Sequence, residues 1–387
     1  MKNVLLYYNF SYPLGGGDIL PLTFASWLQS RCELTLAVDS KAGFRRALEA
    51  FGVSLDAERI NVAPLLPDGI NSRSHNFYWS YRRSLRLKRL AAKADICISA
   101  ANVIDFGRPA HHFINMLSGV DHAFTAHSGI VRPETSVKGF LVNEVIRPIA
   151  GMRSKKRIFA DGRERFYSNS KYVHNRLAAF YGDFHDTIFY PPTTYEPEAS
   201  VDAPARDPMR VICLGRISKE KRITDIIDVV ERARRISGKD IKLTIAGPCG
   251  NGGYAMLVRQ SVEARNWITL VDGVFGKAKD NLLRSGSFAV HARRDEEFGI
   301  AVTEYLKAGL ISVVPDEGGS CEVVDKPELS YSSNEDAASK LARLVTDDAF
   351  AKAMREHCRS RALTFSRSEY EKRESGILEK ILSGSSE

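Results

Sequence analysis

Short apolar and β-branched runs alternate along the chain with segments in which apolar residues recur every three to four positions. The runs predict strands and the periodic segments predict helices. In the first half we expect strands at residues 3–10, 33–38, 96–99, 112–116 and 166–168, and helices at 20–29, 42–50, 79–92 and 172–181. After residue 210 the pattern restarts, with strands at 211–214, 243–246, 268–271, 288–291 and 311–314 and helices near 222–236, 254–264, 277–285 and 299–308. This alternation predicts two doubly wound α/β domains with parallel sheets.

The stretch between the two series has the composition of a linker. Residues 194–208 contain three prolines and several acids but no apolar period. A chain of 387 residues also exceeds the size at which a single core stops growing. We therefore expect a first domain at 1–195, a linker at 196–208, a second domain at 209–365 and a C-terminal helix at 366–387 that packs back toward the first domain. Ligands of such sheets bind beyond the carboxyl ends of the strands, which predicts a cleft between two facing domains.

The most informative stretch is 293–309, which follows a predicted strand and opens a predicted helix. Glu296 precedes this helix and Glu304 lies about one and a half turns into it, with Phe298, Gly299 and Ile300 between them. Backbone N–H groups at a helix start favour an anion or a sugar hydroxyl, and glycine lets a ligand approach the backbone closely. Two carboxylates in these places suit the hydroxyls of a ribose and of a sugar ring.

Two further loops follow predicted strands of the second half. The first, residues 215–221, begins with Gly215 and carries Arg216 and Lys221, which are suited to a diphosphate as a bidentate donor and as a point charge. The second, residues 315–324, contains the pair Gly318 and Gly319 followed by a glutamate.

These motifs, in this order, resemble those of the retaining family-4 glycosyltransferases of the GT-B fold. The resemblance implies a GT-B architecture and a retaining transferase that moves a sugar from a nucleotide diphosphate donor to a glycan or lipid-linked acceptor. It implies catalytic roles for Glu296, Arg216 and Lys221, and donor binding by Glu304, Phe298, Gly299, Ile300, Gly318, Gly319 and Gly215. It also implies that the donor is a substrate and that no cofactor or metal ion is required.

In the first half the resemblance is carried by weaker motifs. Gly16 and Gly17 lie in a loop after the first strand and are expected on the acceptor side. Asn115 stands where the family usually has a histidine near the reacting sugar carbon, and His127 is the alternative candidate for that histidine. Histidines within an apolar strand, such as His112, are more often part of the core.

The glutamate motif is most similar to that of the asparagine-linked-glycan mannosyltransferases, which use GDP-mannose. Two residues depart from that branch, which usually has lysine at Arg293 and histidine at Glu297. The sequence thus favours a mannosyl donor, while these departures leave the sugar and the base open.

Composition and charge refine the expected partners. The net charge is +8, and no acid occurs between Asp68 and Asp95, where seven basic residues gather. A helix from about residue 79 would carry Arg82, Arg83, Arg86, Arg89 and Lys93 on one broad face. Two interpretations of residues 73–93 stay open: contact with an anionic membrane surface, or a solvated helix with a polar outer face. Aromatic residues precede these arginines and do not alternate with them, which argues against nucleic acid.

The remaining features indicate a cytoplasmic protein, at the inner face of the membrane if the basic stretch docks there. No apolar run is long enough to span a membrane, and no secretory leader is evident. The six cysteines show no paired C-x-x-C spacing. The rival interpretations are a GT-B sugar-nucleotide epimerase or phosphorylase, and a basic module that binds membrane or nucleic acid.

Overall fold

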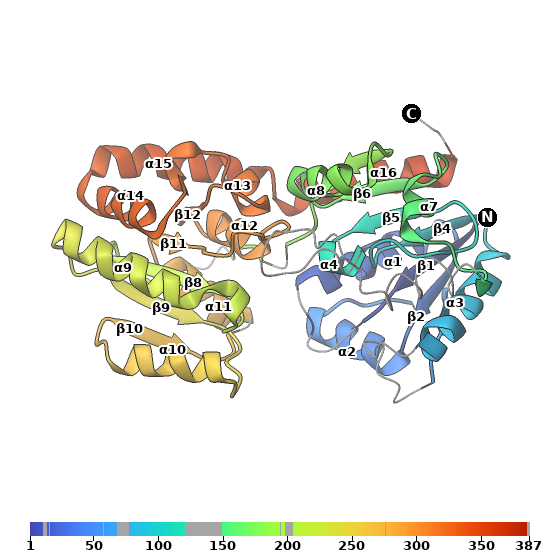
Figure 1. Ribbon diagram of the computed structural model, residues 1–387, viewed down its shortest axis with the longest axis horizontal. Coiled ribbons are helices and arrows are strands. Elements are labelled where there is room, and N and C mark those ends of the chain that lie inside the picture. Colours follow the sequence, from blue (N-terminus) through green and yellow to red (C-terminus); the bar gives the residue numbers. More distant parts are fainter. Residues whose placement is uncertain are drawn as a thin grey trace. The chain divides into compact units, whose positions relative to one another are not determined.

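The computed structural model describes residues 1–10, 14, 16–56, 58–67, 77–120, 149–193, 195–197, 204–274 and 276–384. These residues form two compact units (Figure 1). Unit 1 comprises Met1–Thr194 and Tyr370–Glu387, and unit 2 comprises Tyr195–Glu369. Each unit is built on its own sheet with helices around it.

The described part of unit 1 contains one seven-stranded parallel sheet in the order β3-β2-β1-β4-β5-β6-β7. The strands are Asn3–Tyr8 (β1), Glu33–Val38 (β2), Ile60–Pro64 (β3), Ile96–Ser99 (β4), His111–Ile114 (β5), Arg165–Ser168 (β6) and Asp186–Ile188 (β7). The helices are Leu20–Leu28 (α1), Lys41–Phe51 (α2), Phe77–Ala91 (α3), Leu117–Val120 (α4), Lys155–Phe159 (α7), Lys171–Tyr181 (α8) and Arg367–Ser383 (α16). The predicted parallel, doubly wound architecture is confirmed for this half of the chain.

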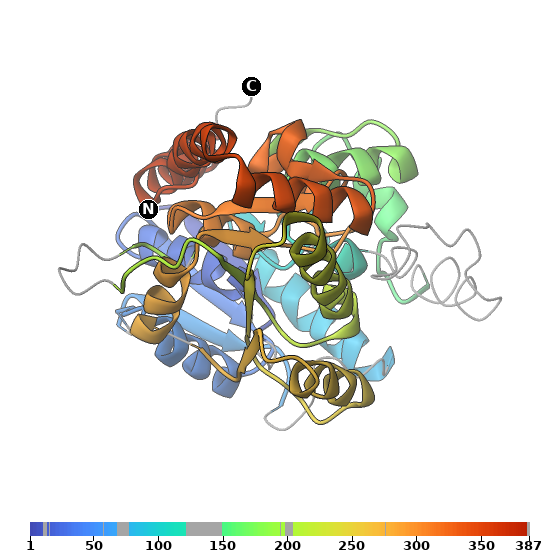
Figure 2. The ribbon, with the colours of Figure 1, turned by 90° about the vertical axis from the view of Figure 1, so that its left-hand side faces the viewer.

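Strand β1 shows how the alternation of side chains builds both faces of this sheet. Val4 and Leu6 belong to a core shared with α1, α2 and α16, whereas Leu5 and Tyr7 belong to a second core shared with α3. Successive strand residues point to opposite faces, so a run of four apolar residues requires helices on both sides. Figures 1 and 2 show α1 and α3 on opposite sides of the sheet.

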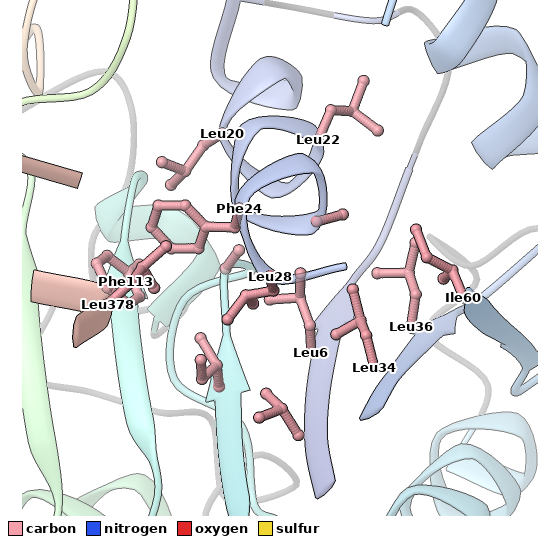
Figure 3. Close-up of a cluster of buried hydrophobic side chains, with 14 of the residues drawn as sticks. Leu6, Leu20, Leu22, Phe24, Leu28, Leu34, Leu36, Ile60, Phe113 and Leu378 are labelled. Carbon is pink, nitrogen blue, oxygen red and sulfur yellow. The ribbon is translucent and has the colours of Figure 1, made fainter. Parts of the chain in front are cut away.

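From Tyr370 onward, the C-terminal helix α16 is part of unit 1. Leu378 and Ile381 are buried in the core that α1 and β1 share (Figure 3). The Tyr370 hydroxyl lies 2.7 Å from the Thr23 hydroxyl of α1 and donates to Glu374 at 2.8 Å. Apolar and polar contacts together hold the end of the chain to the unit in which the chain begins.

The described part of unit 2 contains a six-stranded parallel sheet in the order β10-β9-β8-β11-β12-β13. The strands are Arg210–Leu214 (β8), Lys242–Ala246 (β9), Ile268–Val271 (β10), Phe288–Val290 (β11), Ile311–Pro315 (β12) and Ser330–Tyr331 (β13). The helices are Ile223–Ser237 (α9), Gly253–Glu263 (α10), Gly276–Ser285 (α11), Ile300–Lys307 (α12), Gly319–Val324 (α13), Asn334–Thr346 (α14) and Asp348–Leu363 (α15). This sheet too has the predicted parallel order.

Part of the stretch interpreted as a linker is bound into unit 2. Tyr195 is buried and its hydroxyl donates to Asp280 at 2.7 Å. The Arg206 guanidinium donates to the carbonyl groups of Gly286 and Ala308. The apolar period is absent because these residues are held by single anchoring side chains and not by a regular element.

Candidate functional site

Three loops of unit 2 carry most of the predicted donor residues, and each follows a strand of its sheet. They are residues 215–221 after β8, residues 291–299 after β11 and residues 316–319 after β12. Strand β11 pairs with both β8 and β12 in parallel. The three loops therefore leave the same edge of the sheet as neighbours. Motifs that are far apart in the sequence thus lie close together in space.

The centre of this cluster is an ion pair between Lys221 and Glu296. Lys221 Nζ donates to Glu296 Oε2 at 2.6 Å, and His291 Nε2 lies 3.2 Å from the same oxygen. Burial on its own would raise the pKa of Glu296, but the charge of Lys221 and the contacts with His291 and Arg293 outweigh it. The pKa of Glu296 is consequently held well below its usual range. Glu296 is a carboxylate at neutral pH.

His291 lies beside this ion pair, although it was assigned no role at the site from the sequence. It follows β11 directly, is 5% exposed, and its backbone carbonyl accepts a hydrogen bond of 2.8 Å from the Tyr331 hydroxyl. Burial lowers the pKa of His291, which keeps the ring neutral beside the Glu296 carboxylate. In the sequence, only its position directly after a predicted strand indicates that His291 lies at this edge of the sheet.

The two residues that depart from the mannosyltransferase-like pattern are partners of each other. Arg293 Nη2 donates to Glu297 Oε2 at 2.9 Å, and Arg293 Nη1 lies 3.5 Å from Glu296 Oε1. Burial opposes the charged form of Arg293, but Glu296, Glu297 and Asp295 together raise its pKa. The two departures thus form an ion pair with each other.

The turn formed by Gly318 and Gly319 lies directly against the glutamate motif. Gly319 N–H donates to the carbonyl of Glu296 at 2.7 Å. A Cβ on Gly319 would lie 2.3 Å from the Glu297 carbonyl oxygen, and one on Gly318 would lie 2.4 Å from the Arg294 carbonyl oxygen. Gly318 also has φ +85°. Glycine is required here because backbone occupies the space that a side chain would need.

Gly215 and Gly299 lie at the same edge of the sheet, and both have positive φ. Gly299 has φ +100° and caps the start of α12, and its Cβ would contact Ser320. Gly215 donates its N–H to the Ala246 carbonyl at 2.9 Å, and a Cβ on the neighbouring Gly247 would lie 2.1 Å from the Gly215 oxygen. Both glycines shape the backbone edge at which the Lys221–Glu296 pair lies.

Glu304 belongs to a second pair, with Lys279 of α11. Lys279 Nζ donates to Glu304 Oε1 at 2.8 Å, and Glu304 is 4% exposed. The next residue, Tyr305, accepts a hydrogen bond of 2.5 Å from the backbone N–H of Leu214 at the end of β8. Lys279 was not predicted as a site residue from the sequence, because it lies on a neighbouring helix and outside every motif quoted above.

Three of the predicted residues of unit 2, Arg216, Phe298 and Ile300, have side chains that are not part of these pairs. The Arg216 side chain is 60% exposed and lies 3.6 Å from Glu220. Phe298 is buried against Phe365 with ring centroids 5.8 Å apart, so its side chain serves the core. Ile300 is partly buried as the first residue of α12.

In unit 1, asparagines cross-link the loops that follow β4, β5 and β6. The backbone N–H of Asn115 donates to Asn102 Oδ1 at 2.9 Å. Asn115 Nδ2 donates to the Ala100 carbonyl at 3.1 Å, and Asn169 Nδ2 donates to the Asn115 carbonyl at 3.0 Å. Asn115 therefore positions the carboxyl edge of this sheet.

The other predicted residues of unit 1 are less informative. Gly16 and Gly17 begin the 3₁₀ helix Gly16–Ile19, and a Cβ on Gly17 would meet nothing within 4 Å. His127 lies outside the described residues. His112 is fully buried in β5, with Nε2 2.9 Å from Glu164 Oε2.

Comparison with known proteins finds similarities to the second unit. Residues 197–362 match the family of glycosyl transferases group 1. A 73-residue stretch is 40% identical to a GDP-Man:Man(3)GlcNAc(2)-PP-Dol alpha-1,2-mannosyltransferase of Yarrowia lipolytica. That stretch covers 19% of this chain and 11% of the relative. The stretch that resembles this family lies within unit 2.

Solved structures show the fold of the whole chain. Anabaena HepE, crystallised with UDP and glucose, is similar with a TM-score of 0.67 and 13% identity, over 99% of this chain and 100% of that one. WaaG, a glycosyltransferase involved in lipopolysaccharide biosynthesis, is similar with a TM-score of 0.68 and 14% identity over the same shares. The chain has the GT-B fold, as its sequence predicted.

Two features are absent among the described residues. None of their helices combines the length and apolar character that crossing a membrane requires. They do not bring three or more His, Cys, Asp or Glu side chains together as a candidate metal site.

Proposed function

We propose that this chain transfers a glycosyl unit from a nucleotide diphosphate sugar, with retention at the anomeric carbon, to a glycan or lipid-linked acceptor. The observation that carries the proposal is the Lys221–Glu296 pair, which stands beside the Gly318–Gly319 turn at the carboxyl edge of the unit 2 sheet. A cation and a carboxylate beside a glycine turn together suit a diphosphate linked to a sugar. The match of this unit to the group 1 glycosyltransferases supports the same conclusion.

In this proposal the charges of unit 2 stabilise the departing diphosphate. Lys221 supplies a fixed positive charge, Arg216 folds onto the phosphates from solvent, and the N–H groups at the start of α12 add further donors. Such charges cost no reorganisation when the glycosidic bond breaks. They also make a divalent ion unnecessary, so transfer should persist in EDTA.

Glu296 and Glu304 hold different parts of the donor. Glu304 lies in α12 and is paired with Lys279 of α11. It accepts hydrogen bonds from the ribose hydroxyls. Glu296, held ionised by Lys221, accepts hydrogen bonds from the transferred sugar. The mannosyl donor favoured by the sequence receives support from the Yarrowia relative, while the UDP and glucose bound to HepE keep a uridine donor as the alternative.

The test is a screen of nucleotide sugars by thermal shift, followed by assay of nucleoside diphosphate release with and without lipid-linked and glycan acceptors. Release that depends on acceptor, with a glycosylated product of retained anomeric configuration, is expected. Interconversion of sugar nucleotides without acceptor would establish the epimerase instead. Failure of every nucleotide sugar to stabilise the protein would remove the proposal.

A further inference from the structure

Helix α3 and the turn that follows it present exposed basic side chains that the proposed transfer reaction does not use. Residues 82 and 89 are separated by seven positions, which places them within about 20° of each other around a helix of 3.6 residues per turn. Lys93 lies in the turn, two residues beyond the end of α3, and lines the same groove as Arg89. Arg82, Arg89 and Lys93 are all exposed. Leu87 and Ala91 are buried on the opposite side of the helix. We call Arg82, Arg89 and Lys93 the basic stripe.

The other cations of α3 are held by groups of unit 1. Arg83 pairs with the buried Asp39 at 3.0 Å, and Lys88 pairs with Asp105 at 2.6 Å. Arg86 donates to the Leu65 carbonyl at 3.0 Å. The broad basic face expected from the sequence is therefore narrower, because Arg83 turns toward a carboxylate of the core.

The basic stripe retains its charge for an external partner. Within the part of the chain that the structure describes, no hydrogen bond or ion pair engages the side chains of Arg82, Arg89 or Lys93. Tyr78 stands four residues before Arg82 on the same line and is 54% exposed. Such a tyrosine offers an apolar ring with a polar tip, which suits the boundary between lipid and water.

A groove of about 250 Å³ runs beside the stripe, between α3 and the edge strand β3. Ala63, Pro64, Leu65 and Leu90 give it an apolar lining. Arg86, Arg89 and Lys93 add three cations, and no carboxylate of the described residues lines it. An anionic group that continues into an apolar chain matches this combination, whereas a fully hydrated small anion would leave the apolar lining unmatched.

We propose that the basic stripe and this groove bind the phosphate headgroups of an anionic lipid surface. The charge of the stripe complements the headgroups, and the groove receives the apolar part next to a phosphate. Each basic residue at such a surface contributes about fivefold to the partition coefficient. Reversal of two charges should therefore weaken binding by about 25-fold or more, and raised salt should weaken the wild type. The proposal stands apart from donor chemistry, which lies in unit 2.

The test is cosedimentation of the full chain with phosphatidylcholine vesicles that contain or lack phosphatidylglycerol. The variant is Arg89→Glu with Lys93→Glu, and the matched control is Lys41→Glu with Arg45→Glu on α2, which makes the same change of charge at exposed residues of the same unit. We expect the wild type and the α2 control to sediment with anionic vesicles only, and the stripe variant to remain in solution. Arg89→Gln with Lys93→Gln should show an intermediate loss.

Three results would overturn the proposal. They are equal binding to neutral and anionic vesicles, equal losses in the stripe and α2 variants, and wild-type binding by the stripe variant. Thermal unfolding of every variant and its stabilisation by nucleoside diphosphate serve as folding controls. A stripe variant that still responds to the nucleotide but no longer binds vesicles separates this proposal from the proposed transfer.

Discussion

Lys221 and Glu296 form a 2.6 Å ion pair between two loops that follow different strands of unit 2. The pair lies 75 positions apart in the sequence, and the pairing of β11 with β8 brings it together. Its effect is to fix two charges at the sheet edge: the ammonium is positioned and the carboxylate stays ionised. A donor diphosphate that contacts Lys221 would share this cation with Glu296, and the nucleotide affinities of variants at these two residues depend on that competition.

The two glutamates of the motif should differ in what they contribute to binding. Glu304→Gln is expected to weaken binding of a nucleoside diphosphate by about tenfold, because the ribose loses a charged acceptor. Glu296→Gln should bind the same nucleotide as tightly as the wild type or more tightly, since it removes a negative charge 2.6 Å from Lys221 Nζ, yet it should slow transfer. Calorimetry with a ligand that lacks the sugar, and a transfer assay, measure the two effects. Equal losses of nucleotide affinity would contradict this division.

Gly319→Ala should damage the site through the backbone. The added Cβ would lie 2.3 Å from the Glu297 carbonyl oxygen and 2.5 Å from Phe298 Cα, so the turn must move away from the motif. We expect lower stability of unit 2 and at least tenfold weaker nucleotide binding. Gly253→Ala at the start of α10 is the matched control, because its Cβ would meet nothing within 4 Å. Similar behaviour of the two variants would show that the close approach is unimportant.

Unit 1 should lose stability as the pH falls from 7 to 5. Burial lowers the pKa of His111 to about 4, against an ordinary value near 6.5. Below pH 6.5, His111 becomes protonated in the unfolded chain but stays neutral in the folded chain. The stabilisation from neutral His111 is therefore complete above that pH and declines below it. The loss from this residue is about 2 kcal/mol at pH 5.

Urea denaturation at pH 7 and pH 5 measures this loss. Glutamine at position 111 cannot titrate. From pH 7 to pH 5, the free energy of unfolding of His111→Gln should therefore fall by about 2 kcal/mol less than that of the wild type. His185→Gln, at an exposed histidine of the same unit, should keep the wild-type drop. A drop in His111→Gln as large as in the wild type would assign the pH dependence to other groups.

The central strands and most of the helices could be predicted because their apolar runs are long enough to show a period. The edge strands Ile60–Pro64, Asp186–Ile188 and Ser330–Tyr331 could not, since two of them have only three and two residues. Pairing with an interior neighbour, and not their own composition, makes them strands. Helices α14 and α15 were also missed, although Ser333 and Asp347 cap them through their side chains.

The candidate site was predictable to the extent that it follows strand ends. Glu296, Lys221 and the Gly318–Gly319 turn come together because β8, β11 and β12 are neighbours in the sheet. The partnership of Lys279 with Glu304 depends on how two helices pack, and the exposure of Arg216 depends on its side-chain conformation. Neither property is recorded in a linear motif.

The most direct test of the account is calorimetric titration of UDP and GDP into the wild type, Lys221→Ala and Lys219→Ala. Lys219 lies in the same loop and is exposed, so it matches the loss of charge without the contact to Glu296. The account predicts that one of the two nucleotides binds the wild type and Lys219→Ala alike. Lys221→Ala should bind it about 10- to 150-fold more weakly, because a charge-assisted contact contributes roughly 1.5–3 kcal/mol. Wild-type affinity in Lys221→Ala would contradict the assignment of unit 2 as the site of a nucleotide diphosphate donor.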